Sequence, residues 1–101
     1  MLNDVVEAEL GALPPDMRAR FTRISQLIEA VGLPRVSEPH VRHLRGKLWE
    51  MRLKGKAGIA RAIYVAARGK RVVVVRAFVK KTQRTPMGEL DLAEDRAKEV
   101  E

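Results

Sequence analysis

Hydrophobic positions in the first third of the chain recur at the spacing of an α-helix. Asn3, a residue type that caps helix starts, precedes a short apolar stretch that Gly11 ends, which predicts a helix over 4–10. A second helix is predicted to open at Pro15 or Asp16 and to close at Gly32. Its apolar positions lie three and four residues apart, at Met17, Phe21, Ile24, Leu27, Ile28 and Val31.

The middle of the chain changes from helical spacing to extended runs. Residues 33–46 show no period and are rich in proline and polar residues, which predicts a loop. Three extended runs follow at 47–53, 59–66 and 71–79, separated by short connections that contain glycine. Such connections join antiparallel neighbours, so the runs predict an antiparallel meander.

A final helix is predicted in the acidic stretch at the end of the chain. Thr85 is expected to cap it, Pro86 to occupy its first position, and the stripe from Leu90 to Val100 to be its apolar face. The predicted fold class is therefore α+β: a small antiparallel sheet of three or more strands, N-terminal helices on one face, and a C-terminal helix. At 101 residues, the chain is expected to form a single domain over 1–101.

Alternation along the strands divides the predicted sheet into two unlike faces. Alternate positions in the middle strand are small, as at Ala60 and Ala62, which suits a face covered by helices. In the last strand, 73, 75, 77 and 79 are expected to share that face. The opposite face is expected to be an open, shallow basic depression around Phe78, formed by Arg52, Arg61, Arg76 and Lys80.

Charge is distributed unevenly along the chain. Lys and Arg number 20 against 13 Asp and Glu, a formal net charge of +7, and nearly all of the bases lie within 18–84, between two acidic ends. This distribution predicts one basic surface for a polyanion, and the excess of arginine over lysine favours phosphate recognition. Further candidates for RNA contact are Arg45, Lys47, Lys54, Lys56 and Arg84.

Several classes of site are excluded or disfavoured. The chain has no cysteine, which excludes disulfides, thiolate metal sites and cysteine nucleophiles. His40 and His43 have no third ligand at a set spacing, so no metal and no cofactor are expected. No apolar run reaches the length of a membrane span and the start lacks a basic signal region, so we expect a cytoplasmic protein with no membrane partner.

Four stretches of the sequence carry a family resemblance. They are 39–44 (PHVRHL), 48–52 (LWEMR), 61–64 (RAIY) and, most specifically, 78–86 (FVKKTQRTP). Together they resemble the phage-derived branch of the RelE/HigB toxins of bacterial type II toxin–antitoxin systems, and the match covers nearly the whole chain in order. Some members of that family have a tyrosine where this chain has Met87, and the family usually begins with a strand before its first helix.

The resemblance implies a metal-independent, ribosome-dependent endoribonuclease that cuts mRNA. It also implies a tightly bound partner, a helix-turn-helix antitoxin of the HigA-like kind. The family's catalytic cations fall on Arg52, Arg61, Lys80 and Lys81, and Glu50 is a candidate base. On this reading, Arg61→Ala is expected to abolish growth inhibition and to leave the fold intact.

Two alternatives from other classes stay open at this point. One is a ParE-like inhibitor of DNA gyrase with the same fold, which the lack of an obvious general base favours. The other is a non-catalytic nucleic-acid-binding protein. The basic face is where an acidic segment of the antitoxin is expected to compete with RNA; the alternative is that the antitoxin binds the helices, away from that face.

Overall fold

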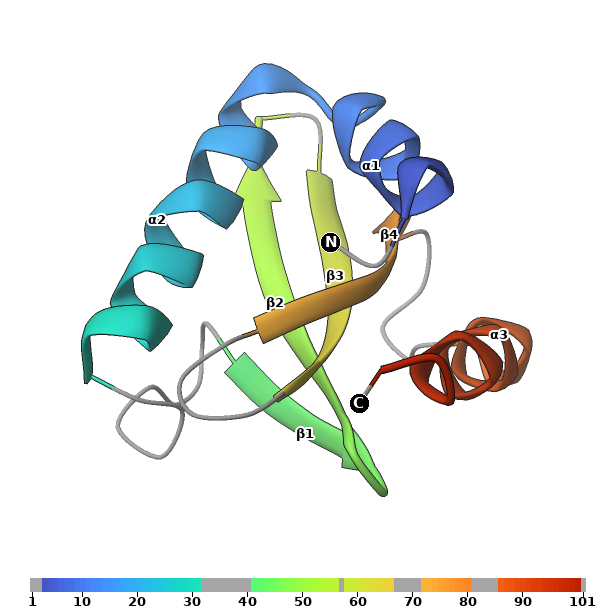
Figure 1. The fold of residues 1–101 in the computed structure, drawn as a ribbon. Helices are drawn as coiled ribbons and strands as arrows, with labels where there is room; N and C mark the ends of the chain where they lie inside the picture. The colour runs from blue at the N-terminus through green and yellow to red at the C-terminus, as the bar shows by residue number, and fades with distance from the viewer. Residues whose placement is uncertain (1–2, 32–40, 57, 67–71, 81–85, 101) are drawn as a thin grey trace.

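A four-stranded antiparallel sheet in the order β1-β2-β3-β4 forms the centre of the molecule (Figure 1). The computed structural model describes residues 3–31, 41–56, 58–66, 72–80 and 86–100. The strands are β1 (Val41–Arg45), β2 (Leu48–Gly55), β3 (Gly58–Ala66) and β4 (Val72–Lys80), and the helices are α1 (Asp4–Gly11), α2 (Pro15–Val31) and α3 (Met87–Ala97). The predicted α+β fold class is confirmed.

The two N-terminal helices form where the sequence predicts them. The side chain of Asn3 caps α1 by accepting a hydrogen bond of 3.1 Å from the backbone N–H of Val6. Helix α2 presents Met17, Ile24 and Ile28 to the sheet, all almost fully buried. Each such side chain contributes about 1.5–3 kcal/mol through burial, so the apolar stripe fixes which side of α2 faces the core.

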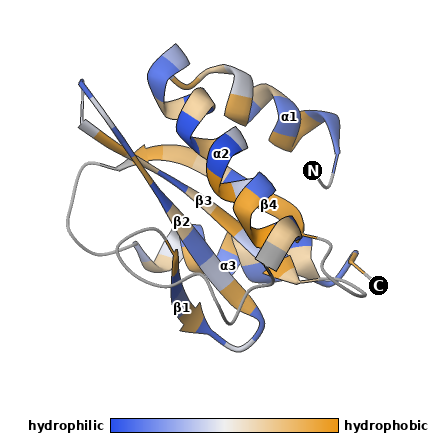
Figure 2. Ribbon diagram, turned by 90° about the vertical axis from the view of Figure 1, so that its left-hand side faces the viewer, coloured by the Kyte–Doolittle hydropathy of each residue, from blue (hydrophilic) through white to orange (hydrophobic). Residues whose placement is uncertain are grey.

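Two apolar layers hold the helices on opposite faces of the sheet (Figure 2). Helices α1 and α2 cover the face that carries Met51, Ala62 and Tyr64, while Ala93 of α3 packs on the other face against Ile63 and Val75. The face expected to be open is therefore partly covered by the C-terminal helix. None of the helices in the described ranges is long and apolar enough to cross a membrane.

The prediction of a loop over 33–46 is wrong for its last part, because Val41–Arg45 forms β1. This edge strand pairs with β2, with Val41 opposite Met51 and His43 opposite Trp49. The His43 and Trp49 rings lie edge to face, with their centroids 4.9 Å apart. Edge strands depend on their neighbour's hydrogen bonds and need little apolar alternation, which explains the missing sequence signal.

The predicted face assignment in the last strand is also wrong. The pairing of β3 with β4 shifts between Ile63, which faces Arg76, and Tyr64, which faces Val74, so one extra residue lies in β4. As a result Val75 packs in the layer under α3, while Ala77 packs under α1 and α2. A β-bulge of this kind reverses the alternation of every residue beyond it.

The start of α3 differs from the prediction by one residue. Pro86 is the N-cap and Met87 the first helical residue, whereas Pro86 was expected at the first position. Thr85, the predicted cap, lies outside the described residues. Helix ends of this kind vary by a residue or two, and the fixed φ of proline suits either position.

The β2–β3 turn is tied to the first turn of α2 by Asp16. Its carboxylate accepts a hydrogen bond of 2.8 Å from the backbone N–H of Lys56, and this bond lowers the pKa of Asp16 below its ordinary value. Gly55 permits the contact, because a Cβ atom there would lie 2.6 Å from the Asp16 carboxylate and 2.9 Å from Met17 Cγ.

Gly55→Ala is therefore expected to lower the free energy of unfolding by about 1–3 kcal/mol, since the methyl group has to displace Asp16 or Met17. Urea denaturation measures the change. Gly88→Ala is the matched control, because a Cβ there meets nothing within 4 Å and alanine favours the helix by about 0.5–1 kcal/mol. Equal denaturation midpoints for Gly55→Ala and the parent would contradict the close packing at the turn.

Candidate nucleic-acid interface

The register of the strands brings the predicted cations together on the sheet face that α3 shares. Arg52 lies opposite Arg61, and Arg61 lies opposite Phe78. Helix α3 packs on the end of this face around Val65 and Val73, while Arg52 and Phe78 at the other end stay half-exposed. We call the surface formed by Arg52 and Phe78, over Arg61, the sheet-face site.

A fully buried ion pair lies beneath the sheet-face site. Arg61 Nη1 donates to both carboxylate oxygens of Glu50, at 2.6 and 2.8 Å. Arg61 is 2% exposed and Glu50 is 0% exposed. A general base has to reach the proton that it removes, so this position favours a counter-ion role for Glu50. The pair also removes the charge of Arg61 from the surface, so the described cations of this face that reach solvent are Arg52 and, beside it, Arg42 and Lys54.

Arg52 differs from Arg45, Arg61 and Arg76 because it has no acidic partner within the described ranges; Arg42, on the edge strand β1, has none there either. The side chain is half-exposed, and its cross-strand neighbour Arg61 is already neutralised by Glu50. An arginine held on a rigid strand without a carboxylate partner has its hydrogen-bond donors available for an anion. The geometry therefore makes Arg52 the best-placed phosphate ligand of the described sheet.

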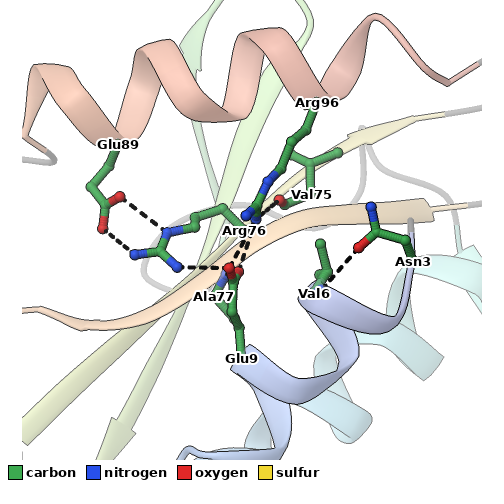
Figure 3. Close-up of polar contacts among 8 residues, drawn as sticks. All are labelled: Asn3, Val6, Glu9, Val75, Arg76, Ala77, Glu89 and Arg96. Carbon is green, nitrogen blue, oxygen red and sulfur yellow. Dashed lines mark hydrogen bonds and ion pairs between the residues drawn. The ribbon is translucent and has the colours of Figure 1, made fainter.

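Arg76 is placed differently from the sequence-based expectation. It binds Glu89 of α3 through two bonds of 3.0 Å and Glu9 of α1 at 2.8 Å (Figure 3). Hydrogen bonding to Glu89 is the main cause that raises the pKa of Arg76. Arg76 therefore joins two helices to β4, with its guanidinium 5.5 Å from the centre of the Phe78 ring, and it does not line an open depression. Its contact with RNA stays a prediction.

The same cluster protects the outer edge of β4. Glu9 accepts a hydrogen bond from the backbone N–H of Ala77, and Arg96 donates to the carbonyl oxygen of Val75 at 2.8 Å (Figure 3). Arg96 also pairs with Glu9 at 3.0 Å. β4 is the last strand of the sheet, and unpaired backbone groups along an edge attract other strands. Side chains of α1 and α3 thus satisfy groups that an additional strand would otherwise pair.

Glu9→Ala is expected to lower the free energy of unfolding by about 1–3 kcal/mol, because it leaves the Ala77 N–H and two half-buried arginines short of a partner. Glu7→Ala, on the exposed side of the same helix, is the control and should change stability by less than about 0.5 kcal/mol. Thermal and urea unfolding of both variants test this. Equal losses in the two variants would show that the network contributes nothing specific.

The remaining predicted RNA-contact residues are scattered. Arg45 binds Asp91 and Glu94 of α3, at 2.8 and 2.6 Å, and thereby ties β1 to α3. The side chains of Lys47, Lys54 and Lys56 are exposed. Lys80 ends β4 in register with Ile59. Lys81 and Arg84 lie outside the described residues.

The acidic partners of these arginines are what the sequence reasoning missed. Glu9, Glu89, Asp91 and Glu94 lie in the two acidic ends of the chain, far in sequence from the bases that they bind. The only sequence signal is the acidic character of those ends. As for metals, no group of three metal-binding side chains forms in the part of the chain that the structure describes, and the His43 ring instead bonds the Gly46 carbonyl oxygen at 2.9 Å. His40 lies outside that part.

Comparison with known families now adds to this geometry. Residues 8–98 match the model of the family described as Phage derived protein Gp49-like (DUF891). The chain belongs to this family. The Gp49-like family is of the RelE/HigB-like toxin kind in general, which agrees with the helix-flanked antiparallel sheet. A search of curated proteins found no match to the chain.

Proposed function

We propose that this Gp49-like protein is the toxin of a type II toxin–antitoxin system, of the HigB-like branch, and that it cuts mRNA on the ribosome. The observation that carries the proposal is Arg52, a half-exposed arginine without an acidic partner in the described sheet, beside Phe78 and above the buried Glu50–Arg61 pair. Cations with a neighbouring aromatic ring suit single-stranded RNA, whose phosphates they bind and whose bases stack.

The proposed chemistry is attack of a ribose 2′-hydroxyl on the adjacent phosphate, with release of the 5′-oxygen. The P–O bond to the 2′-oxygen forms as the bond to the leaving oxygen breaks, and negative charge builds up on the phosphoryl oxygens. Water takes the 2′-hydroxyl proton and supplies one to the 5′-oxygen, so the products are a 2′,3′-cyclic phosphate and a 5′-hydroxyl. Arg52 is proposed to stabilise that charge directly, together with Lys80 and Lys81, the cations that the family resemblance assigns. Glu50 and Arg61 are proposed to hold the strand geometry beneath. No metal ion takes part in this scheme.

Cleavage in a reconstituted translation reaction tests the proposal. The purified protein is incubated with a defined mRNA alone and with the same mRNA on translating ribosomes, and the new 5′ ends are mapped. We expect cuts within the coding region only when ribosomes are present. Intact mRNA in both reactions, at protein concentrations equal to those of the ribosomes, would overturn the proposed function.

One observation favours a second candidate, inhibition of DNA gyrase by binding alone. Glu50, the candidate base, is shielded from solvent, and a protein that only binds needs no base. A supercoiling assay with purified gyrase distinguishes the candidates, since a gyrase inhibitor blocks supercoiling and leaves translating mRNA intact. The proposed mRNA nuclease does the reverse.

We further propose that the partner is a helix-turn-helix antitoxin that neutralises the toxin in the cytoplasm. An acidic antitoxin segment that competes with RNA has to reach Arg52 and the lysines beside it. The double variant Arg52→Glu/Lys54→Glu is then expected to weaken antitoxin binding, measured by calorimetry with the antitoxin encoded beside the toxin. Unchanged affinity would show that the antitoxin binds elsewhere.

A further inference from the structure

The described arginines fall into two groups, paired and unpaired with acids. Each arginine at the contacts between sheet and helices has a carboxylate within ion-pair distance, and these are Arg45, Arg61, Arg76 and Arg96. Within the described ranges, no carboxylate pairs with the three arginines of α2, which are Arg18, Arg20 and Arg23. All three are exposed. The fold therefore neutralises its internal arginines and leaves those of α2 free to bind an external anion.

Acidic groups gather on the other two helices. The exposed acids of α1 and α3 include Asp4, Glu7, Asp91 and Asp95. The pairing of Glu9 with Arg96 joins these two helices; α3 lies across the sheet from α2, whereas α1 shares the face that α2 covers (Figure 1). A protein with this polarity turns the arginine-bearing surface of α2 toward a polyanion and its α3 side away from it.

The basic surface of α2 is separate from the sheet-face site. Helix α2 packs on the Met51 and Tyr64 side of the sheet, whereas Arg52 lies on the other side. Arg20 and Arg23 are one turn apart and so are neighbours on the helix surface. The helix itself is held rigidly, because its inner stripe is buried and Asp16 ties its first turn to the β2–β3 turn.

We propose that the outer face of α2 binds the phosphodiester backbone of a folded RNA segment, separate from the single strand at the sheet-face site. The inference rests on the proposed RNA-directed function. Besides its arginines, the exposed face of α2 carries small and polar residues together with Leu27 and Glu29, and its aromatic residue, Phe21, is half-buried against the core. Such a face offers no platform for stacking bases but binds backbone phosphates without sequence preference.

Binding to a short RNA duplex tests this inference without ribosomes or cleavage. Arg20→Gln/Arg23→Gln removes two positive charges, and Lys98→Glu, at an exposed position beside α3, changes the net charge equally. We expect the α2 variant to bind the duplex more weakly by about tenfold or more. The slope of log affinity against log salt concentration should become shallower by about 2. We expect Lys98→Glu to bind within about twofold of the parent, since a distant charge acts only through the screened field.

The outcomes separate this inference from the proposed function. Loss of duplex binding in the α2 variant supports the inference even if the parent fails to cut mRNA. Equal duplex affinity in the α2 variant and the parent overturns it, whether or not the parent cuts mRNA. Equal duplex affinity with loss of neutralisation by the antitoxin would overturn it too and assign the face to an acidic protein.

Discussion

Arg61→Ala is expected to lower the free energy of unfolding by about 3–5 kcal/mol, because it leaves the Glu50 carboxylate buried without its counter-ion. Domains of this size have a free energy of unfolding of about 5–15 kcal/mol, so the loss ranges from about a fifth of the stability to all of it. Urea denaturation followed by far-UV circular dichroism measures the loss. The buried pair thus argues against an intact fold in this variant, while its effect on growth inhibition stays a prediction.

The control replaces both partners with apolar side chains of similar size. Glu50→Leu/Arg61→Met removes both charges, and such replacements are commonly neutral or stabilising. The free energy of unfolding of the double variant is expected to lie within about 2 kcal/mol of that of the parent. If Arg61→Ala alone unfolds at the parent's denaturant midpoint, the pair does not hold the sheet as described here.

The largest expected effect on activity is that of Arg52→Ala. Removal of a guanidinium that binds the scissile phosphate should slow ribosome-dependent mRNA cleavage by about 10²–10³-fold, the usual effect of losing one donor to developing negative charge. Stability should change by less than about 1 kcal/mol, because Arg52 is half-exposed and has no carboxylate partner in the described chain. Single-turnover cleavage on stalled ribosomes is the measurement.

The comparison with two other variants makes the Arg52 result specific. Lys98→Ala removes a cation on the acidic side of the molecule and should leave the cleavage rate unchanged. If Glu50→Leu/Arg61→Met folds and still cuts mRNA, the role of Arg61 is to hold the fold, and Arg52 is the arginine that acts on the phosphate. A parent-like rate in Arg52→Ala would remove Arg52 from the site.

Much of the fold follows from local signals in the sequence. The cap at Asn3 and the apolar stripe of α2 predict the first two helices because both act within a few turns of chain. The strands β2, β3 and β4 follow from extended runs bounded by glycine. The two features that escaped have no local signal. β1 is fixed by pairing with β2, and the extra residue of the bulge, Val75, ends a run of four valines, 72–75, whose identical side chains do not mark a change of face.

The site was less predictable, because it depends on contacts distant in sequence. Alternation correctly places Arg52 and Arg61 on one sheet face, and the hairpin register brings Glu50 within reach of Arg61. That pairing was accessible from the sequence, since a symmetric hairpin sets Glu50 and Arg61 diagonally across two strands. The partners of Arg76 were not, because Glu9 and Glu89 reach it only through the docking of α1 and α3.

Induction of the protein in a bacterial host tests the central claim most directly. The RNA 5′ ends are mapped across the transcriptome, and protein and DNA synthesis are pulse-labelled in the same culture. We expect an early loss of translation with new mRNA ends inside coding regions. Induction of Arg52→Ala should produce neither effect. An early loss of DNA synthesis without such ends would contradict the central claim and assign the protein to gyrase inhibition.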